Sequence, residues 1–213
     1  MQKKKKKFKS LVLLSGGMDS GVCLANELLM EDADVTGLIM NYGQSHEVET
    51  DYAKQIAKHY SVPIMELNLY DIFKGMNSYL TGNAEVNTYV PARNFVFLSI
   101  ATALAEDMGF DRVVIGAHKE DAGGYPDTTE SFIRKASEAA QEGTKNNIKI
   151  VAPFVKVTKD KIVERGSLLG FPFEKSITCY NGQNPPCGEC NSCKLRAKAF
   201  KDANKKDPLN KGE

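Results

Sequence analysis

The sequence predicts an α/β protein, built as a doubly wound, mainly parallel five-stranded sheet covered by helices and followed by a small C-terminal metal-binding segment. Short aliphatic runs alternate with longer segments of helical spacing, which is typical of parallel sheets. The first run, residues 11–14, is apolar on both faces, as a buried parallel strand is. Four cysteines fall within fifteen residues near the end of the chain, a density that indicates metal binding.

The elements follow from periodicity and from their flanking residues. The expected strands are residues 11–14, 35–40, 63–69, 112–115 and 148–154. The expected helices are residues 20–30, 45–60, 93–108, 129–142, 158–169 and 190–203. Pro91 precedes the helix 93–108 and Gly109 follows it, which marks both ends. Because doubly wound sheets bind ligands at the carboxyl ends of their strands, the loops after the strands hold the candidate sites.

Composition excludes several classes. The chain has 213 residues, of which 42% are hydrophobic and 26% charged, as in a soluble globular domain. Its longest mostly apolar stretch, residues 94–105, is too short to cross a bilayer. Five cysteines are too few for a disulfide-stapled secreted scaffold of this length. We therefore expect a soluble, cytoplasmic protein that has no membrane partner.

The net charge of +1 conceals an uneven distribution. Six basic residues stand in the first nine positions, which leaves 22 basic against 27 acidic residues, or about −5, in the body. A lysine run of this kind can touch nucleic acid or anionic lipid, or it can be a solvated, disordered arm. The acidic body gives little support to nucleic-acid binding, so we expect residues 1–10 to be a disordered arm.

The segment Ser15-Gly16-Gly17-Met18-Asp19-Ser20 directly follows the first predicted strand and opens the first predicted helix. Its two glycines let backbone N–H groups approach an anion, and the helix N-terminus adds a positive dipole end. Ser15 and Ser20 add hydroxyl donors, and Asp19 can cap the helix or orient a magnesium-bound phosphate. The alternative is an ordinary glycine turn and helix cap. We expect the segment to bind nucleotide phosphates through residues of this loop and helix: Leu14, Ser15, Gly16, Gly17, Met18, Asp19, Ser20, Gly21, Val22, Cys23 and Leu24.

The four C-terminal cysteines are Cys179, Cys187, Cys190 and Cys193. Four thiolates at this spacing can close a tetrahedral, structural Zn²⁺ site. An iron–sulfur cluster is the alternative, although the ferredoxin pattern would continue with a further Cys-Pro that is absent here. Disulfides are less favoured in a cytoplasmic chain. We expect one Zn²⁺ that fastens the C-terminal helix to the rest of the domain.

Taken together, these motifs resemble the 7-cyano-7-deazaguanine synthase family within the ATP pyrophosphatases, which carry an SGGxDS phosphate loop. The likeness runs from Leu11 to Lys201. It includes the phosphate loop and the cysteine cluster together with five further segments: Asn41-Tyr42-Gly43-Gln44-Ser45-His46, Pro91-Ala92-Arg93-Asn94, residues 116–127 ending in Gly123-Gly124-Tyr125-Pro126-Asp127, Thr158-Lys159 and Thr178-Cys179-Tyr180. The resemblance implies an ATP pyrophosphatase domain over residues 11–175, followed by a zinc-binding knuckle and helix over residues 176–213.

The resemblance also implies the reaction. Family members convert 7-carboxy-7-deazaguanine and ammonia to the nitrile, adenylating first the carboxylate and then the amide, with ATP cleaved to AMP and pyrophosphate and Mg²⁺ as a cofactor. The product feeds queuosine or archaeosine synthesis, and the family suggests a homodimer. Ser15, Asp19 and Ser20 would act on the phosphates. Lys159 matches a lysine that related adenylating enzymes place there, and Arg93 is a second candidate; their alternatives are a solvated lysine and a structural ion pair.

Four residues are candidate substrate contacts. Asp121, Tyr125 and Asp127 follow the fourth predicted strand, where a carboxylate can accept hydrogen bonds from a deazaguanine edge; loop capping is the alternative. His46 can contact substrate or cap the helix that follows it.

The chain also departs from the family pattern. Thr128-Thr129-Glu130-Ser131-Phe132 stands where the family commonly has Cys-Arg-Pro-Glu-Phe, and Ser176-Ile177-Thr178 where it has Thr-Trp-Ser. The lost arginine leaves open a divergent adenylating enzyme with another acceptor, such as a defence-system relative. A tRNA-modifying ATP pyrophosphatase and a zinc module that holds RNA are two further alternatives.

Overall fold

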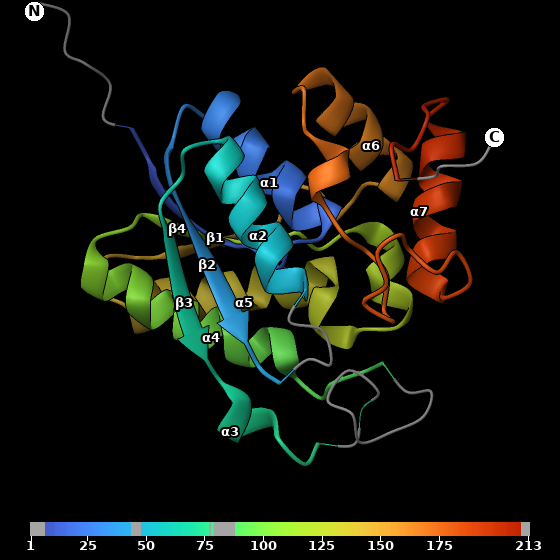
Figure 1. Cartoon of the computed structure of the whole chain (residues 1–213). Helices are drawn as coiled ribbons and strands as arrows, with labels where there is room; N and C mark the ends of the chain where they lie inside the picture. Colours follow the sequence, from blue (N-terminus) through green and yellow to red (C-terminus); the bar gives the residue numbers. More distant parts are fainter. Residues whose placement is uncertain (1–6, 44–47, 77, 79–87, 210–213) are drawn as a thin grey trace, which may run out of the picture.

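The computed structural model describes residues 7–43, 48–76, 78 and 88–209, and it confirms the predicted α/β architecture (Figure 1). Five parallel strands form one sheet in the order β3-β2-β1-β4-β5. The strands are β1 (Lys9–Leu13), β2 (Asp34–Asn41), β3 (Ile64–Asn68), β4 (Arg112–Val114) and β5 (Lys149–Val151). The chain winds outward from β1 to β3 and then returns to the other side of β1 to form β4. The direction of winding therefore reverses between β1 and β4.

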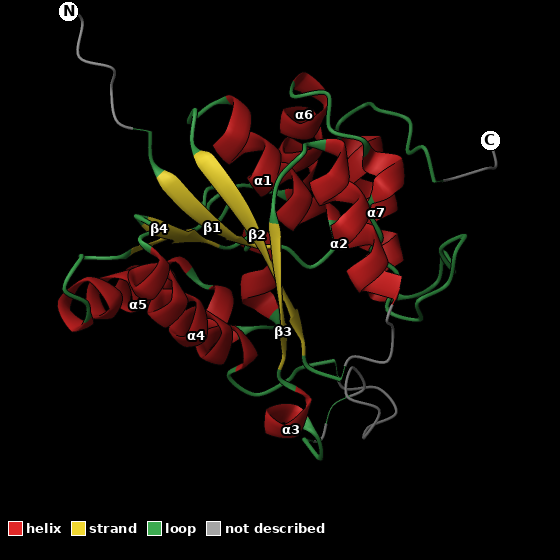
Figure 2. Ribbon diagram, turned by 60° about the vertical axis from the view of Figure 1, so that its left-hand side comes forward, coloured by secondary structure: helices red, strands yellow, loops and turns green. Residues whose placement is uncertain are grey.

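Helices cover both faces of the sheet (Figure 2). One face carries α1 (Met18–Leu29), α2 (Val48–His59), α6 (Lys159–Leu168) and α7 (Asn191–Asp202). The other carries α4 (Arg93–Met108) and α5 (Glu130–Gly143), while the short α3 (Tyr70–Phe73) follows β3. Along β1, Val12 faces the first hydrophobic core, whereas Leu11 and Leu13 face the second. This alternation explains why the first strand is apolar on both sides.

Most predicted boundaries agree with the structure within a few residues. Helix α4 spans the predicted range and ends at Gly109, which adopts a left-handed conformation with φ of 72°. Thr129 caps α5 by accepting a hydrogen bond from the Phe132 N–H at 3.2 Å. Strand β5 is shorter than predicted. Short helices were missed because three to five residues carry no detectable period; they are α3 and the 3₁₀ helices η2 (Lys119–Gly123), η3 (Pro126–Thr128) and η4 (Phe173–Lys175).

The basic arm expected over residues 1–10 needs one correction. Strand β1 begins at Lys9, and Ser10 is fully buried and pairs with both β2 and β4. The Lys9 N–H also donates to Asp111 Oδ2 at 2.8 Å. The last two residues of the expected arm therefore belong to the sheet, because β1 is flanked by strands on both sides that extend its pairing. Residues 1–6 lie outside the described part of the chain.

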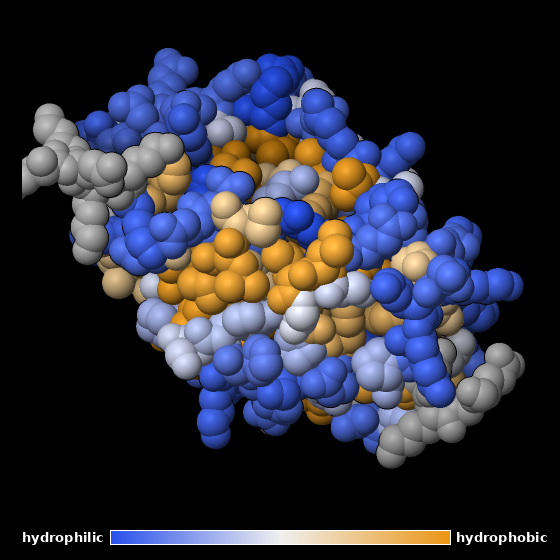
Figure 3. Space-filling model, turned by 90° about the horizontal axis from the view of Figure 1, so that it is seen from above, coloured by the Kyte–Doolittle hydropathy of each residue, from blue (hydrophilic) through white to orange (hydrophobic). Residues whose placement is uncertain are grey.

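Seen from above in Figure 3, the face opposite the strand arrowheads gathers hydrophobic side chains at its centre, bordered by hydrophilic ones. Large apolar side chains that are about half exposed include Phe8, Leu29, Met30 and Met108. Among the described residues, no helix combines the length and apolar character needed to span a bilayer.

Candidate active site

A cavity of about 250 Å³ opens at the carboxyl ends of β1, β2 and β4. Its walls include Leu14 after β1, Met40 in β2 and Gly116 after β4. It lies where the winding of the sheet reverses, which is the position at which open α/β sheets bind ligands. The cavity therefore occupies the edge at which the sequence predicts a site.

The predicted phosphate loop forms one wall, through Ser15, Gly17, Asp19 and Ser20. The Ser15 N–H donates to Ser20 Oγ at 3.2 Å, and the Ser20 hydroxyl donates to the Gly17 carbonyl at 3.0 Å. The hydroxyl oxygens of Ser15 and Ser20 are 3.1 Å apart. These bonds fix the loop against the N-terminus of α1, where free N–H groups and the helix dipole favour an anion.

Two glycines let this loop pack closely against its neighbours. Gly16 has φ of +82°, and a Cβ atom there would lie 2.2 Å from the Glu49 carbonyl oxygen of α2. A Cβ atom at Gly116 would lie 2.8 Å from the Ser20 backbone nitrogen. Both positions require glycine, because backbone atoms cannot move aside as flexible side chains can.

Several of the expected nucleotide contacts do not line the cavity. Gly16 and Gly21 pack against α2 and Phe171, respectively. The other four are fully buried in the hydrophobic core behind the loop; they are Met18, Val22, Cys23 and Leu24. The structure places these six residues as support for the loop, because the inward face of α1 turns away from the cavity.

Lys159, the first residue of α6, reaches across the site to Asp19 of α1. Its Nζ is 2.8 Å from Asp19 Oδ2, and its side chain is only 7% exposed. Burial raises the pKa of the Asp19 carboxyl, but the charges of Lys159 and His118 outweigh burial and leave this pKa below its usual value. Asp19 Oδ1 is buried and has no hydrogen-bond partner among the described residues. Lys159 therefore lines the cavity beside the phosphate loop, and the alternative of a solvated lysine does not hold.

His118 is an additional buried group beside this pair. Its Nε2 lies 3.4 Å from Lys159 Nζ and 3.2 Å from Asp121 Oδ1, while its Nδ1 lies 3.1 Å from Glu120 Oε2. The ring is 2% exposed. Asp121 Oδ2 also accepts from the His118 N–H at 3.1 Å, and burial raises the pKa of this carboxyl. Asp121, Lys159 and Asp19 line the cavity, whereas His118 stands behind them.

Arg93 occupies another wall, at the start of α4. Its Nη1 donates to the Tyr42 hydroxyl at 3.0 Å, and its guanidinium lies 5.3 Å from the centroid of that ring. Its Nε is buried without a partner among the described residues. Glu49 of α2 lines the same cavity, and burial raises the pKa of its carboxyl to about 7 although the Arg93 charge acts in the opposite direction. A guanidinium and an acid thus stand together in this wall of the cavity.

The structure places the remaining substrate candidates in different surroundings. Tyr125 lines the cavity, with its hydroxyl 3.0 Å from Thr88 Oγ1 and 3.4 Å from the Tyr180 hydroxyl. Asp127 does not line it; its carboxylate accepts from the Asn94 N–H at 2.8 Å and from the Asn94 side-chain amide at 3.3 Å. Asp127 thereby fixes the N-terminus of α4. His46 lies outside the described residues.

The four C-terminal cysteines converge as predicted. Their Sγ atoms all lie within 4.8 Å of one another, and Cys187 and Cys193 are 3.9 Å apart. A tetrahedral Zn²⁺ with bonds of about 2.3 Å would place sulfur atoms about 3.8 Å apart. Hydrogen bonds from the Cys190 and Glu189 N–H groups lower the pKa of the Cys187 thiol to about 6, with the Cys190 N–H as the main cause. The four-thiol donor set and these distances fit a structural metal ion.

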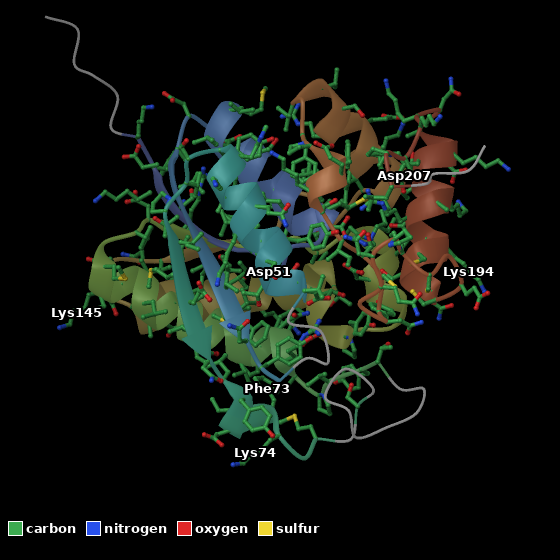
Figure 4. The ribbon with its side chains drawn as sticks, viewed as in Figure 1. Asp51, Phe73, Lys74, Lys145, Lys194 and Asp207 are labelled. Atoms are coloured by element: carbon green, nitrogen blue, oxygen red, sulfur yellow. The ribbon has the colours of Figure 1, made fainter. Side chains whose placement is uncertain are left out.

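Arg196 of α7 connects this cysteine segment to the cavity wall. It makes a two-pronged pair with Asp207, at 2.8 and 2.9 Å, and Figure 4 shows Asp207 beside α7. Its Nη1 donates to the Ser176 carbonyl at 3.2 Å and to Thr178 Oγ1 at 3.2 Å. Because Ile177 and Thr178 line the cavity, the C-terminal segment shapes one of its walls.

Sequence reasoning missed His118, Glu49 and Arg196 as parts of this site. His118 follows the fourth strand by a few residues, so the rule for strand ends could have indicated it. Glu49 and Arg196 stand on helices far along the chain from the loops they face. Only the packing of α2 and α7 brings them to the site.

The fold and the site define the class of protein. A solved U34-tRNA thiolase from Methanococcus maripaludis aligns with 94% of this chain and 65% of its own, with a TM-score of 0.53 and 20% identity. An NH₃-dependent NAD synthetase from Campylobacter jejuni aligns with 82% of this chain and 69% of its own, with a TM-score of 0.51 and 16% identity. At these identities the likeness concerns the fold alone. The chain therefore has the α/β fold of these two proteins, with residues 15–20 at the switch point of its sheet.

Sequence comparison narrows the class to one family. The family described as "Queuosine biosynthesis protein QueC" matches residues 9–204. A 7-cyano-7-deazaguanine synthase of Nitratiruptor sp. is 38% identical over 95% of this chain and 98% of its own length. A 7-cyano-7-deazaguanine synthase of Thermoplasma volcanium is 40% identical over 94% of this chain and 90% of its own length. The chain belongs to the QueC family.

Proposed function

We propose that this protein is an ATP-dependent ligase that converts 7-carboxy-7-deazaguanine and ammonia to 7-cyano-7-deazaguanine. The observation that carries the proposal is that a single cavity joins the SGGxDS loop and Lys159 to Asp121, Tyr125 and Arg93 in a member of the QueC family. The product would serve queuosine or archaeosine synthesis.

The phosphate side of the cavity suits adenylate transfer. Attack of a carboxylate on the α-phosphate builds negative charge on the phosphoryl oxygens and on the departing pyrophosphate. The loop N–H groups, the hydroxyls of Ser15 and Ser20, and Lys159 supply fixed donors and a positive charge for it. Mg²⁺ keeps most of its waters and binds mainly through phosphates, so we propose that it enters with ATP.

The substrate side offers complementary groups. The Arg93 guanidinium supplies a positive charge suited to an anionic carboxylate, and Tyr125 and Glu49 offer oxygens to a deazaguanine edge. Thr128, at the position where the family commonly has cysteine, also lines the cavity. Asp127 is withdrawn from this role, because its carboxylate is already bound by Asn94.

Zn²⁺ is proposed as the resident ion of Cys179, Cys187, Cys190 and Cys193, where it would supply structural cross-linking. Metal analysis of the purified protein should find about one zinc and no labile sulfide per chain. Iron and sulfide at cluster stoichiometry would contradict the assignment.

A sulfur-transferring tRNA enzyme is the alternative within the same class. It would require a reactive thiol near the cavity. Cys23 is fully buried against the Ile115 carbonyl, and burial raises its pKa well above the usual value. The remaining cysteines form the metal cluster, so the ligase is favoured.

The direct test uses zinc-loaded protein with ATP, Mg²⁺, ammonium and 7-carboxy-7-deazaguanine, with all products read by mass. We expect two AMP and two pyrophosphate for each nitrile formed. Nitrile formation would also show that the residues after Asp127, which depart from the family pattern, are compatible with the reaction. AMP without nitrile would indicate another acceptor and contradict the proposal.

Homodimer formation and a cytoplasmic location are further proposals from the family. Light scattering coupled to size exclusion tests the first, and a monomer at micromolar concentration would contradict it.

A further inference from the structure

Both halves of the proposed reaction release protons inside the cavity, and this inference rests on the proposed function. When ammonia attacks the adenylated carboxyl, its lone pair forms the C–N bond and the nitrogen becomes positively charged. An N–H bond must then break, and the C–O bond to AMP breaks with its electron pair leaving on the phosphate. When the adenylated amide becomes the nitrile, further N–H protons are lost as the second C–O bond breaks. A proton acceptor with a path to water would speed these steps.

A line of three side chains runs from the cavity toward solvent. Asp121 lines the cavity, and its Oδ1 lies 3.2 Å from His118 Nε2. On the other side of the ring, His118 Nδ1 lies 3.1 Å from Glu120 Oε2. The exposed fraction is 2% for the His118 side chain and 35% for the Glu120 side chain. The imidazole thus bridges an acid at the cavity and an acid at the surface.

We propose that Asp121, His118 and Glu120 form a proton relay that accepts protons from the attacking ammonia and from the amide nitrogen. The proton passes from nitrogen to the Asp121 carboxylate and then to His118 Nε2. The ring releases its other proton from Nδ1 to Glu120, which exchanges with water. Asp121 is the catalytic residue of the three, and His118 acts through it.

The surroundings of the ring support this role. The groups that face His118 are Asp19 from α1, Lys159 from α6, and Glu120 and Asp121 from η2. Three acids and one base surround it, so a positive charge carried in transit is compensated. Glu120 is held in place because its Oε1 accepts from the Lys159 N–H at 3.2 Å. Asp19 is a poorer acceptor than Asp121, because Lys159 already occupies one of its oxygens and its pKa is lowered.

The same contacts would also exist if His118 only held Lys159 and Asp121 in position. Adenylation requires no proton acceptor, whereas attack by ammonia does. Exchange of labelled pyrophosphate into ATP, with 7-carboxy-7-deazaguanine present and ammonia absent, measures adenylation alone. Nitrile formation with ammonium measures the complete reaction.

His118→Gln keeps a polar side chain but removes the imidazole ring, so the side chain can no longer pass a proton from Asp121 to Glu120. We expect pyrophosphate exchange close to wild type and nitrile formation lowered on the order of 10²–10⁴-fold. Glu120→Gln should lower nitrile formation less, because water can reach that end of the relay. His59→Gln, an exposed histidine on α2, is the matched control and should leave both rates unchanged.

Equal losses of exchange and nitrile formation in His118→Gln would overturn the relay and leave a positioning role. If that variant fails to fold, Glu120→Gln decides: wild-type nitrile formation would overturn the relay, and a selective loss would support it. Wild-type protein without any substrate-dependent exchange would contradict the proposed function itself.

Discussion

Helix α1 carries one buried acid near each end, and the two acids have different surroundings. Glu27, in the C-terminal half, accepts from the Ser10 hydroxyl at 2.7 Å and pairs with Arg112 at 2.7 Å, with its side chain 2% exposed. Asp19, in the first turn, lines the cavity and pairs with Lys159, while its Oδ1 has no partner in the part of the chain that the structure describes; its side chain is 18% exposed.

The difference separates a structural ion pair from a functional one. Both pairs join α1 to another element, and both contain a buried acid. An acid whose partners enclose it has nothing left to offer a ligand, whereas an acid that opens on a cavity does. Burial with a partner is therefore weak evidence of function, and the direction of the unpaired atom is stronger evidence.

Arg196 should give the largest effect, because its pair with Asp207 is enclosed like that of Glu27 yet it also supports the cavity wall. Arg196→Met leaves the Asp207 carboxylate buried without its counter-charge, although the Leu209 N–H still donates to its Oδ1 at 3.1 Å. We expect a loss of about 3–5 kcal/mol in the free energy of unfolding, measured in urea. Activity should also fall, since Thr178 loses its support. The exposed control Lys198→Met should leave stability close to that of the wild type; a loss comparable to that of Arg196→Met would contradict this ranking.

Lys159→Met should lower activity much more than stability. We expect kcat/KM to fall on the order of 10²–10³-fold, as for removal of one charge-stabilising donor. Stability should fall less than in Arg196→Met, because Asp19 borders the cavity and water there can approach its carboxylate. Lys161→Met, an exposed change on the same helix, serves as the control. A large loss of stability with little loss of activity would make Lys159 structural.

Glu27→Gln should affect stability rather than activity. It keeps the shape of the side chain but removes its charge beside Arg112. We expect only a small loss of stability, because Gln no longer balances the Arg112 charge but also no longer carries the buried charge whose cost raises the pKa of Glu27. The kcat of the folded fraction should not change. Glu31→Gln, an exposed change near the end of the same helix, is the control, and a selective loss of kcat in Glu27→Gln would break the comparison.

The smallest expected effect is on the pH dependence of stability. The pKa of Asp19 is lowered in the folded protein, so its contribution to stability is complete above its ordinary value of 3.8 and is lost as pH falls through the lowered value. Burial raises the pKa of Glu27, so its contribution is complete below its ordinary value of 4.5 and is lost as pH rises through the raised value. Urea unfolding of Asp19→Asn and Glu27→Gln between pH 3 and 7, each compared with wild type, should therefore show slopes of opposite sign. Slopes of the same sign would contradict the assignment.

Local patterns predicted the parts of the site that are local in sequence. The phosphate loop and the four cysteines each gather within a short segment, and a helix start or a metal knuckle brings such residues together. The five strands were found because parallel strands are apolar on both faces.

Contacts between distant segments were not predictable in the same way. Asp127 looks like a ligand-binding loop residue, but the N-terminus of α4 binds its carboxylate. The sequence indicates Lys159 as a candidate at the phosphates, but its contact with Asp19 depends on the packing of α6 against α1. The role proposed for His118 depends on four neighbouring side chains that come from three elements, α1, α6 and η2. A single sequence without the fold does not specify these partners.

The central claim is that the cavity adenylates a carboxylate and then an amide. It is tested most directly by supplying 7-carboxy-7-deazaguanine with both carboxylate oxygens labelled as ¹⁸O, together with ATP and ammonium. The account predicts that each AMP carries one labelled oxygen and that the nitrile carries none. AMP without label would contradict it, because ATP would then be cleaved without activating the carboxyl group.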